Sequence, residues 1–173
     1  FLVPDGVREH FREGFGKRGR GLRENWFSLF EAYKQAYPDL ADYLYQMQHR
    51  QLPEGWDGAL PSFPADAKGL ATRDSSGKTL NSIARNVPWL IGGSADLAPS
   101  AKTRLTFDDA GDFLPGTYQG RNLHFGIREH VMSAVLNGLA LSKVRAFGST
   151  FLVFCDYARP PMRLSALMEI PVI

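Results

Sequence analysis

Cysteine is almost absent from the chain, which has a single one, Cys155, in 173 residues. A lone cysteine excludes an internal disulfide and a zinc site built from cysteine pairs, and it is typical of a reducing compartment. The histidines are also few, and none is paired at the spacing of zinc ligands; they are His10, His49, His124 and His130. We therefore predict no metal ligand in this chain.

An excess of one charge is lacking as well, since 20 lysines and arginines oppose 18 acidic residues. The net charge of +2 gives no support to a nucleic-acid or membrane-surface partner. No apolar run reaches the roughly 20 residues of a membrane-spanning helix, and residues 1–5 do not open a signal peptide. We expect neither nucleic acid nor membrane among the partners.

The composition is that of a globular protein, with 44% apolar and 22% charged residues. The first residue is not methionine, and the last three, Pro171 to Ile173, look like the opening of a strand. We therefore expect an internal piece of a longer protein.

Apolar periodicity predicts a helical first third. A polar helix is expected to end near Gly14, and an aromatic helix follows over residues 25–37. A break at Pro38 and Asp39 precedes a short helix over residues 40–47. Residues 51–68, rich in proline and glycine, predict an extended connector.

Beyond residue 70, helices and strands alternate, which predicts an α/β fold with a parallel sheet. The helix over residues 129–141 is apolar almost all round, so we expect it to be buried. Pro160 is expected near the first turn of the last helix. The predicted elements are a helix at 72–86, a strand at 89–93, a short apolar segment at 122–125, a helix at 129–141, a strand at 150–154, a helix at 156–168 and a strand opening at 171.

Two glycine motifs are set aside. Residues 14–19 spell GxGxxG, but a dinucleotide site needs a preceding strand, and residues 10–13 are polar and helical in pattern. The basic cluster Gly16–Arg20 is predicted to be a solvated loop, with nucleic-acid binding as a distant alternative. Gly77, Lys78 and Thr79 resemble the end of a phosphate loop, but Thr72 stands where its leading glycine should be.

Three stretches carry the chemistry. Residues 92–100 follow a predicted strand, where parallel sheets bind ligands. Residues 120–130 place Glu129 at the start of a buried helix, and residues 150–157 carry three aromatic side chains at intervals of three. Their sequences GGSADL, GRNLHFGIREH and TFLVFCDY closely resemble the central part of transketolases, and the resemblance extends along the whole chain.

The resemblance implies a thiamine-diphosphate enzyme that moves a two-carbon ketol unit from a ketose phosphate to an aldose phosphate, as in the pentose phosphate pathway. It assigns residues 1–38 to the tail of the diphosphate-binding domain, 39–72 to a connector and 73–173 to the first part of the pyrimidine-binding domain. It further implies a homodimer with shared active sites and a divalent metal, Mg²⁺ or Ca²⁺, bound by diphosphate-domain residues that precede this chain. The expected location is the cytoplasm, or the plastid stroma in a photosynthetic eukaryote.

Glu129 matches the family's glutamate that binds the pyrimidine ring nitrogen. A carboxyl group in an apolar pocket has its charged form disfavoured, so it can hold or share a proton with that ring. From the sequence alone, the competing interpretation is a helix-start glutamate that only complements the dipole.

The remaining assignments also follow from the resemblance. Phe151, Phe154 and Tyr157 match the aromatic pocket around the pyrimidine, where flat rings stack. Asp96 and Leu97 match cofactor contacts. Arg73 and Ser100 match residues that hold the phosphate of the sugar substrate, and a guanidinium fork suits that group. Buried structural hydrogen bonds are expected for His124, Arg128 and His130.

Two alternatives stay open. A related ketol-transferring enzyme, such as a dihydroxyacetone synthase, would share these motifs. A non-catalytic interaction fragment would keep the fold without activity. In either case we expect this segment to be inactive by itself, because the resemblance places other binding residues outside it.

Overall fold

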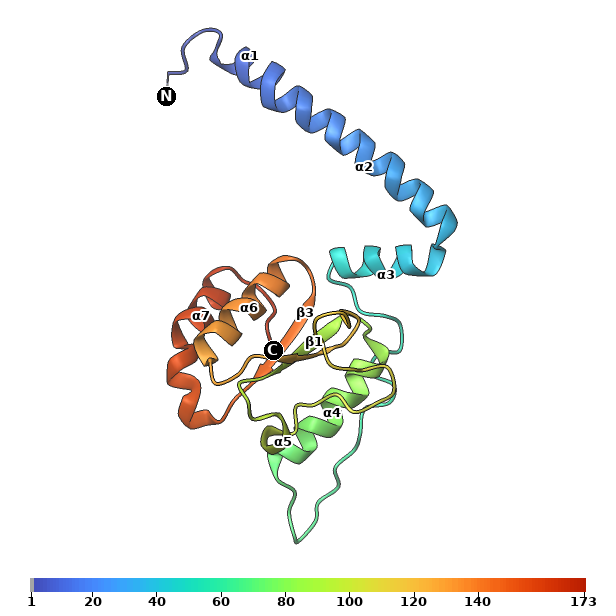
Figure 1. The fold of residues 1–173 in the computed structure, drawn as a ribbon, viewed down its shortest axis with the longest axis vertical. Coiled ribbons are helices and arrows are strands. Elements are labelled where there is room, and N and C mark those ends of the chain that lie inside the picture. The colour runs from blue at the N-terminus through green and yellow to red at the C-terminus, as the bar shows by residue number, and fades with distance from the viewer. Residues whose placement is uncertain (1) are drawn as a thin grey trace. The chain divides into compact units, whose positions relative to one another are not determined.

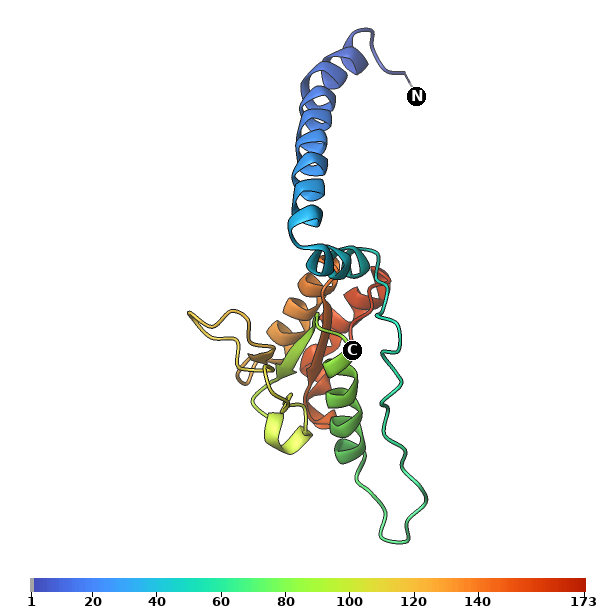
Figure 2. The ribbon, with the colours of Figure 1, turned by 90° about the vertical axis from the view of Figure 1, so that its right-hand side faces the viewer.

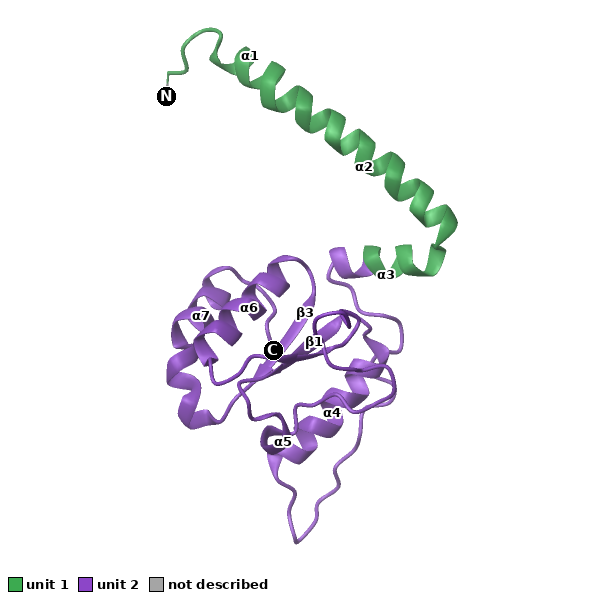
Figure 3. Ribbon diagram, viewed as in Figure 1, with its two compact units in different colours: residues 1–45 green, residues 46–173 purple. Residues whose placement is uncertain are grey.

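Residues 2–45 of the computed structural model form a helical unit, one of the two units into which the chain divides (Figure 3). Helix α1 (Val7–Phe11) runs through a π-helical segment (Arg12–Gly16) into α2 (Lys17–Ala36). Tyr37 leaves helical geometry, and α3 (Pro38–Gln48) begins at the proline, as the predicted break requires. No helix among residues 2–173 is long and apolar enough to cross a membrane.

The predicted helix end near Gly14 and the predicted loop at Gly16–Arg20 are wrong. A glycine ends a helix by adopting a left-handed conformation, but Gly16 has φ −63° and ψ −47°, which is helical. Side-chain pairs also support this stretch, since Arg18 lies 5.1 Å from the centre of the Phe15 ring. A glycine inside a helix costs only about 1 kcal/mol, so the helix continues.

Residues 46–173 form the second unit, in which helices surround a three-stranded parallel sheet (Figures 1 and 2). The strand order is β2-β1-β3, and Val172 adds a parallel bridge to Ala146, where a strand was expected to open. The α/β fold with a parallel sheet is thus confirmed. The elements are α4 (Thr72–Asn86), β1 (Leu90–Ser94), α5 (Ala98–Ala101), β2 (Asn122–His124), α6 (Glu129–Leu141), β3 (Arg145–Ser149), a 3-10 turn (Leu152–Phe154) and α7 (Cys155–Leu167).

Each face of the sheet carries its own core cluster, because neighbouring side chains of a strand point to opposite faces. Phe147 of β3 packs in a cluster with Ala84 and Val87 at the end of α4. Its neighbour Ala146 packs in a second cluster with Met132 and Leu136 of α6. The helices that carry predicted site residues are therefore fixed to opposite faces of one short sheet.

Gly92 and Gly93 let β1 approach both neighbouring strands closely. A Cβ atom on Gly92 would overlap the carbonyl oxygen of Phe147 in β3, and one on Gly93 would overlap that of Leu123 in β2. Any side chain at these positions would push the strands apart. The GG pair of the motif is therefore explained by strand packing.

The predicted strand at 150–154 is wrong. Strand β3 covers Arg145–Ser149 instead, and its last ladder pair joins Ser149 to Ser94. Beyond Ser94, β1 turns away at Asp96, which has φ +60°, so Thr150 has no strand to pair with. The apolar run that suggested a buried strand is exposed, and Leu152 is 86% accessible.

The predictions for the two last helices need smaller corrections. Helix α6 is buried on one face only, since Val131 and Val135 on the other face are 47% and 42% accessible. Pro160 and Pro161 lie in the second turn of α7. The carbonyl oxygen of Pro161 accepts hydrogen bonds from Asn137 Nδ2 (2.9 Å) and Ser165 Oγ (3.0 Å), which joins α7 to α6.

Arg121 joins the end of α4 to the start of β1. Its Nη2 atom donates to the carbonyl oxygens of Ala84, Val87 and Leu90, each at 2.8 Å, and its Nε donates to Leu90 at 3.0 Å. The guanidinium also lies 5.2 Å from the centre of the Phe107 ring. Burial lowers the pKa of Arg121, as expected for a cation held by carbonyl dipoles rather than by a carboxylate.

Candidate functional site

A cavity of about 770 Å³ lies beyond the carboxyl end of β1 and at the start of α6. We call it the Glu129 cavity. Five of the six predicted cofactor contacts line it, and they come from the turn after β1, the start of α6 and the segment that joins β3 to α7. Its lining residues are Ala95, Asp96, Leu97, Ile127, Arg128, Glu129, His130, Val131, Phe154 and Tyr157.

Glu129 is the first residue of α6 and is 7% accessible. The positive end of the helix dipole favours its carboxylate there. Among residues 2–173, one side chain bonds it: Thr150 donates its hydroxyl proton to Glu129 Oε1 at 3.1 Å. The rest of the wall is mainly apolar and aromatic. The carboxyl group of Glu129 can therefore form further hydrogen bonds with a ligand that offers a complementary donor or acceptor.

The turn after β1 places Asp96 and Leu97 in the wall. Asp96 adopts a left-handed conformation, which aspartate tolerates better than most residues. Ser94, 3% accessible, holds the turn: its Oγ accepts from the Leu97 N–H at 3.1 Å and donates to the Ser149 carbonyl at 2.8 Å. The ends of β1 and β3 are thereby tied together beside the cavity.

The three predicted aromatic contacts do not all meet in one place. Phe154 and Tyr157 line the Glu129 cavity. Phe151 lines a neighbouring one, although its ring stacks on Phe154 with centres 6.2 Å apart and planes 15° apart. Tyr157 is 66% accessible, so its ring is available for further contacts.

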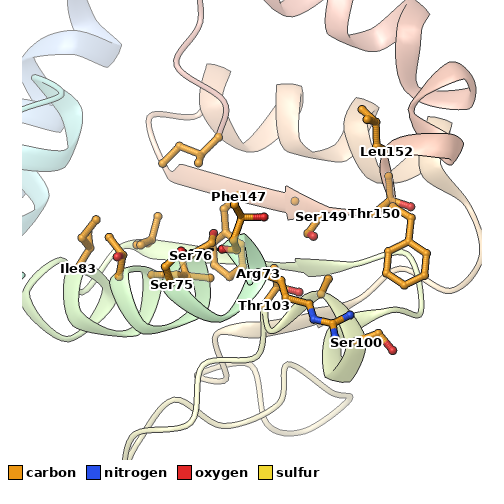
Figure 4. A pocket seen from close by; sticks show the side chains of 18 of the residues that line it. Arg73, Ser75, Ser76, Ile83, Ser100, Thr103, Phe147, Ser149, Thr150 and Leu152 are labelled. Atoms are coloured by element: carbon orange, nitrogen blue, oxygen red, sulfur yellow. Dashed lines mark hydrogen bonds between the residues drawn. The ribbon is translucent and has the colours of Figure 1, made fainter. Parts of the chain in front are cut away.

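The neighbouring cavity, of about 820 Å³, we call the Arg73 cavity (Figure 4). Arg73 of α4 extends toward Ser100 of α5, and both residues line this cavity. Most of its other polar groups are hydroxyls. They belong to Thr72, Ser75, Ser76, Thr79, Thr103, Ser149 and Thr150.

Sequence reasoning missed Ser94 and Thr150. Both lie inside the quoted motifs, but serine and threonine are common residues whose partners depend on strand pairing. The predicted burial of His124 and His130 is wrong, since both side chains are exposed. Arg128 is exposed too, although its Nε donates to the Phe125 carbonyl at 2.6 Å.

His124 belongs to a charged cluster outside the Glu129 cavity. Arg104 Nη1 and His124 Nε2 lie 2.9 and 3.0 Å from Asp112 Oδ1, and Arg104 Nη2 lies 2.9 Å from Oδ2. The guanidinium of Arg104, followed by the His124 ring, holds the pKa of Asp112 below its usual range. The cluster ties residues 104 and 112 of the loop to β2.

We expect Asp112→Asn to flatten the pH dependence of stability in acid. Because the pKa of Asp112 is lower in the folded than in the unfolded state, its carboxylate stabilises the fold above the unfolded value of about 4. That contribution is lost as the pH falls through the folded value. Urea unfolding from pH 7 to pH 2 measures it, with Asp108→Asn as the control in the same loop. A pH profile of Asp112→Asn that matches the parent would contradict the assignment.

Within the part of the chain that the structure describes, no group of three His, Cys, Asp or Glu side chains is placed to hold a metal ion.

Comparison with known proteins gives a consistent result. Residues 68–173 match the family model described as transketolase, pyrimidine binding domain. The whole chain is 49% identical over 174 residues to the transketolase of Geobacillus stearothermophilus, of which it covers 26%.

Two solved structures have the same fold. The chain superposes with a TM-score of 0.86 and 41% identity on a Pichia stipitis transketolase described in complex with xylulose 5-phosphate, over 99% of this chain and 26% of that one. The match to a Leishmania mexicana transketolase has a TM-score of 0.87 and 36% identity, over 99% and 25%. The chain thus spans about a quarter of the length of these relatives. The chain therefore belongs to the transketolase family, and its residues 68–173 match the pyrimidine-binding domain of that family.

Proposed function

We propose that this chain is the central segment of a transketolase, which transfers a two-carbon ketol unit from a ketose phosphate to an aldose phosphate. The observation that carries the proposal is the buried Glu129 carboxyl group, which has one side-chain hydrogen-bond partner among residues 2–173 and lines a cavity whose wall is mainly apolar and aromatic. In the proposed enzyme, the diphosphate-binding domain ends with residues 1–38. A connector over residues 39–72 leads to the first part of the pyrimidine-binding domain, residues 73–173.

The Glu129 cavity fits the aminopyrimidine of thiamine diphosphate. A flat heterocycle needs aromatic and aliphatic faces, which Phe154, Tyr157 and Leu97 offer, with Phe151 stacked behind Phe154. A ring nitrogen needs a proton donor or acceptor, which Glu129 offers from a site shielded from water. When bound, thiamine diphosphate supplies the carbanion chemistry of ketol transfer.

Within that arrangement, Glu129 holds or shares a proton with the ring through a carboxylate oxygen. Burial strengthens this interaction because little water competes for the same atoms. Leu97 and the aromatic rings orient the heterocycle and exclude solvent. Asp96, exposed at the rim, contributes a polar contact.

The Arg73 cavity suits the phosphate group of the sugar. Arg73 offers a planar fork of donors, and Ser100 adds a hydroxyl from the neighbouring helix α5. The Pichia stipitis relative, described with xylulose 5-phosphate, supports a sugar phosphate as the substrate class.

A second subunit completes the proposed site in a homodimer. Large apolar side chains at and beside the Glu129 cavity are exposed, among them Ile127 at 80% and Val153 at 71%, and such patches mark interfaces. The diphosphate and a divalent metal, Mg²⁺ or Ca²⁺, would be held by a diphosphate-binding domain. A dihydroxyacetone synthase is not favoured, because the Geobacillus, Pichia and Leishmania relatives are all transketolases.

A chimera tests the proposal. The aligned quarter of the Geobacillus stearothermophilus enzyme is replaced by this chain, and ketol transfer from xylulose 5-phosphate to ribose 5-phosphate is assayed with and without thiamine diphosphate. We expect a cofactor-dependent activity in the chimera and none in the isolated chain, which provides half of the site. A folded chimera that neither binds the cofactor nor transfers the ketol unit would refute the proposal, and activity of the isolated chain would refute the division of the site.

A further inference from the structure

We propose that Thr150 is a positioning residue, whose hydroxyl fixes the orientation of the Glu129 carboxyl group so that Oε2 faces the cavity. This inference rests on the proposed function of Glu129. The direct observation is the hydrogen bond from Thr150 Oγ1 to Glu129 Oε1, 3.1 Å long and partly buried.

The carboxyl group needs such a partner. The terminal torsion of a glutamate side chain has broad, nearly two-fold preferences, so its own rotamers do not select which oxygen faces a ligand. The dipole of α6 favours the negative charge but does not choose between the two oxygens. Since Thr150 is the one side chain that bonds Glu129 among residues 2–173, this bond decides the orientation.

Thr150 is itself held firmly. It directly follows Ser149, whose carbonyl oxygen accepts from the Ala95 N–H at 3.2 Å and from Ser94 Oγ at 2.8 Å. Its β-branched side chain has few χ1 choices. The hydroxyl is therefore anchored through β3 and β1 to the turn that places Leu97, so that one framework aligns the carboxyl group and the apolar wall.

Thr150 also stands between the two cavities. Its side chain lines the Arg73 cavity (Figure 4). Its hydroxyl bonds the carboxylate of Glu129, which lines the Glu129 cavity. A group in this position can orient Glu129 without occupying the space of a ring bound against Phe154 and Tyr157.

The test uses Thr150→Val in the chimera, because valine keeps the shape and removes the hydroxyl. We expect the dissociation constant of thiamine diphosphate, measured by calorimetry, to rise about 10- to 100-fold, the scale on which lost orientation acts. Thr150→Ser keeps the donor and should retain the parent affinity. Thr106→Val is the matched control, since it removes a hydroxyl bonded to Asn81 and lines neither cavity.

A double-mutant cycle separates positioning from a general structural role. If Thr150 acts through Glu129, then Thr150→Val should not weaken cofactor binding further when Glu129→Ala has already removed the carboxyl group that Thr150 bonds. Equal weakening in both backgrounds would overturn the inference, as would parent-like binding by Thr150→Val. If the parent chimera binds no cofactor, both the proposed function and this inference are refuted. If the parent chimera binds the cofactor and Thr150→Val binds it equally well, only this inference is refuted.

Discussion

Glu129→Gln in the chimera should lower the rate of ketol transfer by about 100- to 10,000-fold, the usual contribution of a positioned acid or base. Glutamine has the size of glutamate and can still accept the Thr150 hydrogen bond, so the fold should persist. It cannot hold and release a proton, which is the proposed task of the carboxyl group. Steady-state rates at saturating cofactor measure the effect.

Asp156→Asn is the matched control, because Asp156 is also a carboxylate in the first turn of a helix, α7. It is exposed and paired with Arg159 at 3.0 Å, and it does not line the Glu129 cavity. If Glu129 only complemented a helix dipole, the two substitutions would have similar, small effects of about 0.3–1 kcal/mol on stability and none on rate. Equal rates for both variants would therefore reject the proposed role.

Arg121→Met should lower the free energy of unfolding by about 3 kcal/mol, a large share of the stability of a domain of this size. The charged guanidinium donates to three carbonyl oxygens, of Ala84, Val87 and Leu90. Methionine fills part of the space but leaves these acceptors without that donor. Urea unfolding at neutral pH measures the loss.

Arg85→Met separates the carbonyl contacts from the aromatic one. Arg85 also lies over the Phe107 ring, at 5.7 Å from its centre, but it is exposed and donates to none of those carbonyls. We expect Arg85→Met to lower the unfolding free energy by about 1 kcal/mol or less. A loss as large as that of Arg121→Met would assign the stabilisation to stacking on Phe107 instead.

The spacing of apolar residues predicts where helices begin and end, but it does not predict which of their faces are buried. Helix α4 begins and ends at the predicted residues, Thr72 and Asn86, and α6 begins at Glu129 as expected. The errors arose where local signals and tertiary contacts differ. Residues 150–154 have strand-like composition, yet they leave the sheet because β1 turns away, and glycines 14 and 16 were misread because only their backbone angles show that the helix continues.

The residues of the candidate site lie within the quoted motifs, but the hydrogen bonds that hold these residues together could not be predicted from the motifs. Five predicted contacts meet in the Glu129 cavity because the segments that carry them follow the ends of parallel strands. The hydroxyls of Ser94 and Thr150 connect them, but those bonds depend on the pairing of Ser94 with Ser149, residues 55 positions apart. No short sequence window contains that information.

The placement of the site also bears on how the family can change in length. Thr150 and Asp96 lie within two residues of the ends of β3 and β1, so the framework sets their positions, and the long intervening loops do not. Loop closure becomes only slowly more costly as residues are added. Lengthening or shortening the loops between the strands should therefore leave the arrangement of Thr150 and Asp96 unchanged. In this fold, changes in loop length and the placement of the candidate site therefore depend on different parts of the chain.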